Sequence, residues 1–196
     1  VQTCALPICA AYTELAELGL AGLYVNEEHG GMGMGPVEAM VVMEELGRGI
    51  VLEPVAQTLI ASAVLQTHAP VAVQAAWLPR IAGGEALVVL AHLERGARHH
   101  LDRCRAEAQE AAGQWTVSGT KSIVPVGDQA DAFIVPALAG GQMALFLVER
   151  GAAGVKTEGY LTQDGARAAE VSLTNSPAQL ITPNGLTALE QAADIG

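Results

Sequence analysis

The spacing of apolar residues changes its period once along the chain. Up to residue 84, apolar positions recur every three or four residues between glycines and prolines, which is typical of amphipathic helices. Beyond Gly83-Gly84, short runs rich in β-branched residues alternate apolar and polar positions, which is typical of strands. The sequence therefore predicts an α+β fold, with an N-terminal helical domain at 10–84 followed by an antiparallel β-barrel or sandwich domain at 85–185.

Four helices are expected in the first part. The first is predicted to end at Gly19, and the others are expected to begin at Pro36, at Pro54 and after Pro70, because proline is favoured in a first helical turn. We expect the methionine and aromatic stripes of these helices to face the core. The glycines of NEEHGGMGMG, residues 26–35, lack the spacing of a phosphate loop and predict a turn with positive φ between two helices.

Seven short strands are predicted in the second part. Two of them meet at Gly119 as a hairpin, and the second ends at Pro125, which cannot donate to a strand ladder. A ligand could reach backbone there, although such a hairpin is far more often plain sheet than a binding site. The predicted strands are Ala86–Leu93, Gln114–Ser118, Thr120–Val126, Ala132–Leu138, Met143–Glu149, Val155–Leu161 and Ala166–Leu173.

Composition excludes several classes of protein. Hydrophobic residues at 51% and charged residues at 16% exclude a disordered chain, and no apolar run is long enough to cross a bilayer. A net charge of -11 argues against nucleic acid or an anionic membrane as a partner. The three cysteines are too few and too irregularly spaced for zinc binding or a disulfide scaffold, so we expect a reducing, cytoplasmic location and no metal.

One basic cluster interrupts this acidic sequence. Residues 94–105, ERGARHHLDRCR, hold four of the ten basic residues. Their guanidinium groups could bind a phosphate or pyrophosphate, with Arg98 and His99 as the candidate contacts, or the segment could be a solvated loop. The adjacent His99 and His100 have no third ligand at a useful spacing, so a metal site is not expected.

Each end of the sequence also allows a prediction. VQTCALPI matches one frame of a common sequencing adapter, so residues 1–9 are interpreted as a non-native leader. Residues 186–196, LTALEQAADIG, have the pattern of an amphipathic helix that stops with the sequence. We therefore expect a chain truncated at the start of a further helical unit.

Several stretches, in this order, resemble the acyl-CoA dehydrogenase family. The similar segments are GLYVNEEHGGMGMG with VVMEELGR, then WLPRIAGGEALVVLAHLE, WTVSGTKSIV, ALFLVERGAAGV and EVSLTNSPAQLI. The resemblance implies a C-terminal helical bundle after residue 186 and FAD-dependent α,β-dehydrogenation of an acyl-CoA thioester. It also implies an electron-transfer flavoprotein as acceptor and a homo- or hetero-oligomer of dehydrogenase subunits.

The resemblance also locates a flavin site, with departures from the family pattern. The family has the motif Thr-Glu-Pro-Gly-Ala-Gly-Ser-Asp at this point. In this chain Leu93 replaces the threonine of the motif, so a flavin-facing hydroxyl is missing. An aromatic residue and a second hydroxyl are replaced by Ile123 and Pro125. The implied base lies in the bundle, so no catalytic residue is assigned. The cofactor-binding candidates, expected to act mainly through backbone groups, are Leu90, Ala91, His92, Leu93, Ile123, Val124 and Pro125.

Three interpretations remain open at this point. The first is part of a working FAD-dependent acyl-CoA dehydrogenase. The second is a non-catalytic partner subunit of a heteromeric acyl-CoA dehydrogenase, whose own flavin site is degenerate. The third is an unrelated binding module in the β-domain, because likeness of fold alone does not establish function.

Overall fold

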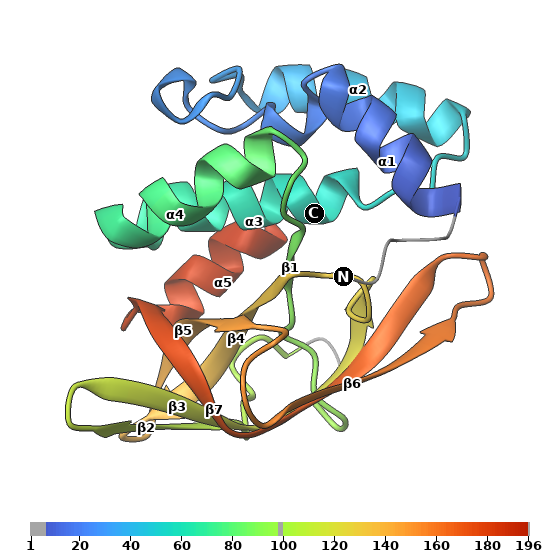
Figure 1. Ribbon diagram of the computed structural model, residues 1–196. Helices are drawn as coiled ribbons and strands as arrows, with labels where there is room; N and C mark the ends of the chain where they lie inside the picture. Colours follow the sequence, from blue (N-terminus) through green and yellow to red (C-terminus); the bar gives the residue numbers. More distant parts are fainter. Residues whose placement is uncertain (1–6, 98–99, 196) are drawn as a thin grey trace.

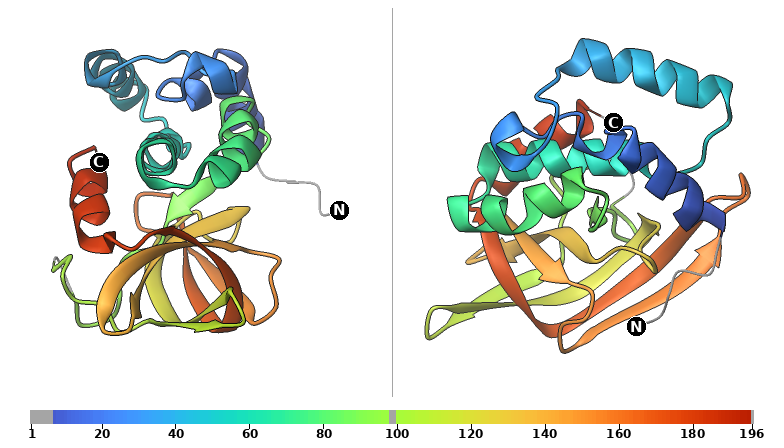
Figure 2. Two further views of the ribbon diagram at one scale, coloured as in Figure 1. Left: turned by 90° about the vertical axis from the view of Figure 1, so that its left-hand side faces the viewer. Right: turned by 45° about the horizontal axis from the view of Figure 1, so that its top comes forward.

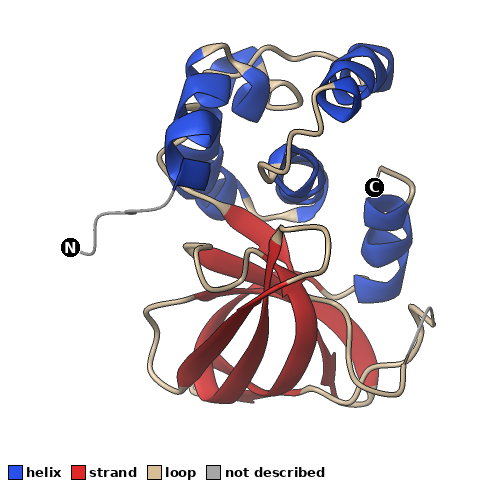
Figure 3. Ribbon diagram, turned by 90° about the vertical axis from the view of Figure 1, so that its right-hand side faces the viewer, coloured by secondary structure: helices blue, strands red, loops and turns tan. Residues whose placement is uncertain are grey.

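Helices form one layer of the molecule and a curved sheet forms the other (Figure 1). The computed structural model describes residues 7–97 and 100–195, so six residues of the expected leader lie outside it. The helices lie on one side of the sheet (Figure 3), where α3 contacts β1 and β7 and α5 contacts both α3 and β5, whereas α2 lies beyond α3. The predicted α+β class, with helices before strands, is confirmed. Among the described residues, no helix has the length and apolar character to cross a membrane.

The helices begin and end close to the punctuation in the sequence. Gly19 follows the first helix with a φ of 87°, and Gly30 and Gly33 have φ values of 81° and 59°, which confirms both glycine predictions. Pro36 opens the second helix, where Glu38 Oε2 accepts a 3.0 Å hydrogen bond from the N–H of Gly35. The helices are α1 (Pro7–Glu17), α2 (Pro36–Arg48), α3 (Val55–His68), α4 (Val71–Ala82) and α5 (Gly185–Ala193), with short 3-10 turns η1 (Leu20–Gly22) and η2 (Glu27–His29).

The strands close into a barrel (Figure 2). β4 pairs with β2 and β5, and β7 pairs with β3 and β5, so β2, β3, β7, β5 and β4 form a ring. β1 and β2 run parallel to β4, whereas the other pairings are antiparallel. The strands are β1 (Val88–Leu90), β2 (Glu107–Ala111), β3 (Gln114–Pro125), β4 (Ala132–Ala139), β5 (Gln142–Glu149), β6 (Val155–Leu161) and β7 (Arg167–Thr182).

The prediction of a hairpin at Gly119 is wrong. β3 is one continuous strand through this position. Gly119 has a φ of 153°, and a Cβ there would lie 2.6 Å from the Cβ of Ala106, so a larger residue would not fit without a shift. The hairpin lies earlier, where Ala112 and Gly113 adopt positive φ and join β3 to β2. β2 was not predicted, because its Glu- and Ala-rich sequence has low β propensity and only Ala108 is buried.

The two largest hydrophobic clusters lie between the layers and inside the barrel. The first lies between the helices and the sheet and includes Leu65 of α3, Trp77 of α4 and Leu145 of β5. The second fills the barrel, with Phe133 and Phe146 both fully buried. Because the first core draws on both parts of the chain, the helical layer is fixed relative to the barrel and can help to line a site on it.

One predicted core stripe faces outward instead. On α2, the side chains of Val37, Met40 and Val41 are 65%, 64% and 54% exposed. Ala39 and Leu46, on the opposite side, pack against α1, α3 and the intervening segment. The periodicity was correct, but the apolar stripe of α2 is wider than the surface available to bury it. This leaves an exposed apolar face, defined here as Val37, Met40 and Val41.

Candidate functional site

The ends of β1 and β3 meet at a small cavity of about 110 Å³. Gln57 and Ile60 of α3 and Ser122 of β3 complete its wall. One of the seven residues predicted to bind the flavin, Ala91, does not line this cavity. It is fully buried in the barrel, and its N–H donates to the carbonyl of Ile134 at 2.9 Å. Six of the seven flavin candidates line the cavity: Leu90, His92, Leu93, Ile123, Val124 and Pro125.

A β-bulge shapes one wall of this cavity. Between Lys121 and Val124, three steps along β3 match two steps along β7, so one residue is extra. Ile123, within the bulge, has a φ of 52° and a side chain that is 54% exposed. The N–H of Ser122 donates to the carbonyl of Leu93 at 2.8 Å and ties the bulge to the segment after β1. The sequence did not predict the bulge, which places unpaired strand backbone beside the cavity.

A buried ion pair lies next to the cavity. Lys121 Nζ donates to Glu94 Oε1 at 2.7 Å, and the two residues are 0% and 7% exposed. The Glu94 carboxylate also accepts the N–H groups of Arg105 and Ala106 at 2.8 and 3.1 Å. Burial opposes ionisation of Glu94, but Lys121 and these N–H groups together hold its pKa below the ordinary value. The carboxylate therefore fixes both ends of the intervening basic loop and attaches it to β3.

Sequence reasoning missed this pair, although one signal was available. Lys121 shares the period-two alternation of Val117, whose side chain is fully buried. A lysine on the inner face of a strand requires a buried partner, because an unpaired charge in the interior is too costly. The partner, Glu94, lies 27 residues earlier and outside a strand, so its identity could not be derived from strand periodicity.

Two titratable side chains next to the pair are held in their neutral forms. Cys104 Sγ lies 3.4 Å from Glu94 Oε1 and 3.3 Å from the carbonyl of Pro136, and burial raises the pKa of its thiol. Burial, followed by the positive charge of Lys121, lowers the pKa of His92. A thiolate nucleophile at Cys104 is therefore disfavoured, whereas a neutral imidazole at His92 is favoured. Within the part of the chain that the structure describes, no three His, Cys, Asp or Glu side chains could share a metal ion.

The basic loop forms a separate hollow of about 270 Å³. Arg95, Arg103 and Arg105 line it together with Glu94 and Asp102. The two phosphate candidates, Arg98 and His99, lie outside the described residues. Three of the four arginines of the predicted cluster thus meet around one hollow, and phosphate binding there stays a prediction.

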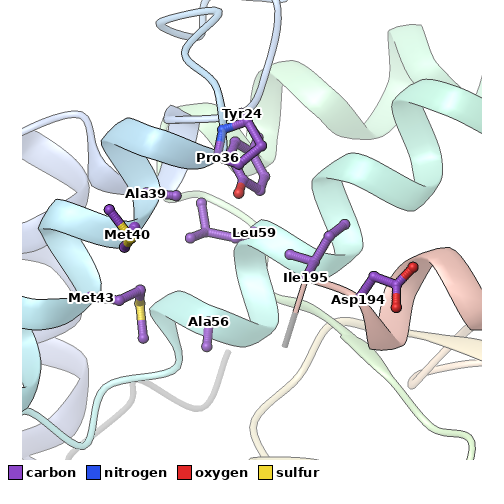
Figure 4. Close-up of a pocket in the computed structure, with 9 residues that line it drawn as sticks. All are labelled: Tyr24, Pro36, Ala39, Met40, Met43, Ala56, Leu59, Asp194 and Ile195. Carbon is purple, nitrogen blue, oxygen red and sulfur yellow. The ribbon is translucent and has the colours of Figure 1, made fainter.

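A larger cavity of about 400 Å³ lies between α2, α3 and the end of α5 (Figure 4). Met40 and Met43 of α2 face Leu59 of α3 and Ile195 across it, and Asp194 contributes a carboxylate at one side. The cavity adjoins the exposed apolar face of α2. None of the predicted site residues lines it.

Comparison with known proteins identifies the type of fold. Residues 3–85 match the family model described as acyl-CoA dehydrogenase, N-terminal domain. (2S)-Methylsuccinyl-CoA dehydrogenase of Cereibacter sphaeroides is 36% identical over 110 residues, which cover 55% of this chain and 20% of that protein. The Tcur3481–Tcur3483 steroid ACAD is 28% identical with a TM-score of 0.87, over 97% of this chain and 52% of the other. An acyl-CoA dehydrogenase complexed with FAD, from Bacillus anthracis, is 25% identical with a TM-score of 0.87, over 96% and 35%.

A helical layer on a closed sheet, with these matches, defines an acyl-CoA dehydrogenase type of fold. Residues 3–85 are therefore similar to the N-terminal domain of the acyl-CoA dehydrogenase family, which confirms the resemblance found in the sequence. The chain spans about half or less of the length of these three proteins, and among the described residues α5 is the last helix, with no helical bundle after it.

The cavity fits part of a flavin. Its apolar wall, formed by Leu90, Val124 and Pro125, suits one face of a flat aromatic ring, and the bulge offers backbone groups to a polar edge. Its volume of about 110 Å³ is below the roughly 300–1,000 Å³ of complete ligand sites. The described residues around this cavity would therefore form only one wall of a complete flavin site.

Proposed function

We propose that this chain forms part of an FAD-dependent acyl-CoA dehydrogenase that oxidises the α,β carbon–carbon bond of an acyl-CoA thioester. In this proposal an electron-transfer flavoprotein accepts the electrons. The observation that supports it is the convergence of six flavin candidates on one cavity at the ends of β1 and β3. FAD, when bound, would accept the β hydrogen as a hydride, which carries both electrons, while a base takes the α proton.

The chain's own residues would bind and orient the ring. Leu90, Val124 and Pro125 exclude water from one of its faces, and the bulge at Ile123 presents backbone to its edge. No carboxylate lines the cavity within the described part of the chain, so the base that removes the α proton must be supplied by another segment or subunit. We therefore expect the 196-residue chain alone to be inactive.

A second candidate function is that of a non-catalytic partner subunit. It is favoured by the apolar side chains of Leu93, Ile123 and Pro125, which provide none of the hydroxyl or aromatic contacts implied by the family resemblance. Each neutral hydrogen bond contributes about 0.5–1.5 kcal/mol, so this loss weakens cofactor binding by a few kcal/mol. The Tcur3481–Tcur3483 steroid ACAD, whose name pairs two components, is consistent with a heteromeric assembly.

Flavin content separates the two candidates. The complete protein that contains this chain would be expressed alone and together with a companion dehydrogenase subunit, and FAD per chain and turnover of an acyl-CoA would be measured for both. Near-stoichiometric FAD and activity without a companion would establish an ordinary enzyme. Flavin and activity only in the heteromer, with less than one FAD per chain, would establish the partner subunit. Neither flavin nor activity in either preparation would contradict both.

A further inference from the structure

Few polar groups of the cavity are available to a ligand. The Ser122 hydroxyl donates to Glu170 Oε2 at 2.9 Å, and its N–H already donates to Leu93. The remaining polar side chains on the wall are those of Gln57 and His92, and neither makes a hydrogen bond to another described residue. His92 is therefore the one titratable side chain, among the described residues of this wall, with free hydrogen-bonding capacity.

His92 lines the cavity and is close enough to Lys121 of the buried ion pair for that charge to lower its pKa. It also lines a smaller hollow beneath, which brings together segments from several elements. The titratable and charged groups around it are Lys121 on β3 and Glu94, His100, Arg103 and Cys104 on the basic loop and its flanks. The Glu94 carboxylate is already engaged by Lys121 and two backbone N–H groups, so it does not serve as a counter-ion for His92.

We propose that the neutral imidazole of His92 hydrogen-bonds the polar edge of the flavin ring, in place of the hydroxyl absent at Leu93, and that it makes flavin binding dependent on pH. This inference rests on the proposed function, because it takes the cavity to be a flavin site. It assigns to the side chain of His92 a positioning role that backbone contacts alone would not provide.

The sign of the pH dependence follows from the surroundings of His92. A flavin ring seated on the cavity removes water from the imidazole and so disfavours its charged form further. A protonated His92 would also repel the ammonium group of Lys121, which is buried and cannot move into solvent. Binding therefore releases a proton when His92 is charged beforehand, and affinity falls as the pH decreases through the pKa of His92 in the ligand-free protein.

The test uses riboflavin, which has the ring but no phosphate, so the arginine-lined hollow does not contribute. Its affinity would be titrated between about pH 5 and pH 8 for the wild type, His92→Gln and His92→Val, in the form of the protein that binds flavin. Gln is uncharged and keeps hydrogen-bonding groups, whereas Val removes them. Thermal unfolding of each variant verifies that it is folded.

We expect wild-type affinity to fall with acidification by up to about tenfold per pH unit. His92→Gln should bind within about threefold of the wild type at the upper end of this range and show no such fall. His92→Val should bind about 2- to 10-fold more weakly there, the equivalent of one neutral hydrogen bond. As a second readout, NMR titration of the imidazole should show its pKa falling further when riboflavin binds.

Two outcomes would count against the proposal in different ways. Riboflavin binding with one affinity and one pH profile in all three proteins would overturn the role of His92 and leave the flavin site standing. Absence of riboflavin binding in all three, at every pH, would overturn the flavin site and this inference together.

Discussion

Replacing Lys121 with methionine tests whether the buried ion pair holds the site together. Methionine is similar in length to lysine but has no charge, so Lys121→Met leaves the Glu94 carboxylate buried with two backbone N–H donors and the weakly donating thiol of Cys104. Lys121 is fully buried and Glu94 is 7% exposed, so the lost ammonium group lies in a poorly solvated position. Breaking a buried pair by removing one partner costs about 3–5 kcal/mol of unfolding free energy.

The unfolding free energy lost in Lys121→Met should become smaller as the pH decreases. In the wild type the pKa of Glu94 is lowered, so the pair stabilises the fold above the unfolded carboxyl pKa of about 4.3 and this contribution disappears as the pH falls through the folded pKa. Without Lys121, burial dominates and the folded pKa of Glu94 rises. Protonation then removes the uncompensated charge, so the gap between wild type and variant narrows on acidification.

Urea denaturation followed by tryptophan fluorescence measures both effects. Trp77 reports on the core between helices and sheet, and Trp115, with its ring centroid 5.2 Å from that of Phe146, reports on the barrel. Lys156→Met is the matched control, because Lys156 and Glu158 form a 2.8 Å ion pair on the surface, and no measurable loss is expected there. A loss below about 1 kcal/mol for Lys121→Met, or an equal loss near pH 7 and pH 4.5, would refute the reasoning.

Two further predictions concern the barrel and the helical layer. Gly119→Ala should lower the unfolding free energy by about 1–3 kcal/mol, because the new Cβ would overlap Ala106, whereas Gly47→Ala, with nothing within 4 Å, should leave the urea midpoint unchanged or slightly raised. If Gly119→Ala had the same unfolding free energy change as Gly47→Ala, the predicted overlap between a Cβ at position 119 and Ala106 would be contradicted. Replacing Val37 and Met40 together with glutamate should reduce binding of a hydrophobic dye without lowering stability, because both side chains are more than 60% exposed. Unchanged dye fluorescence would show that this face does not bind the dye.

Local patterns predicted most helices and strands, because their periods and their proline and glycine boundaries are properties of nearby residues. They failed where a distant partner decides the structure. Gly119 resembles a turn in sequence, but it lies within a continuous strand, where Ala106 leaves no room for a Cβ. The outward stripe of α2 has the correct period, yet periodicity does not show which surface is available to cover it.

The candidate site was predictable to a similar extent. The family resemblance selected the segments around Leu93 and Ile123, and the fold brings them to one cavity. The bulge was not predictable, since it depends on the register of β3 against β7. Neither was the pairing of Lys121 with Glu94, because it joins a strand to a loop and no local pattern links the two.

The central claim is that FAD binds at the cavity lined by Leu90. The most direct test is to titrate FAD into the complete protein, with its companion subunit if it requires one, and to compare the wild type with Leu90→Trp. Leu90 is a half-buried residue on the cavity wall, and a tryptophan there would fill much of the space of about 110 Å³. We predict saturable FAD binding to the wild type and at least a tenfold weaker affinity for a folded Leu90→Trp variant, a difference of about 1.4 kcal/mol. Equal affinity in the two proteins would place the flavin elsewhere and contradict the account.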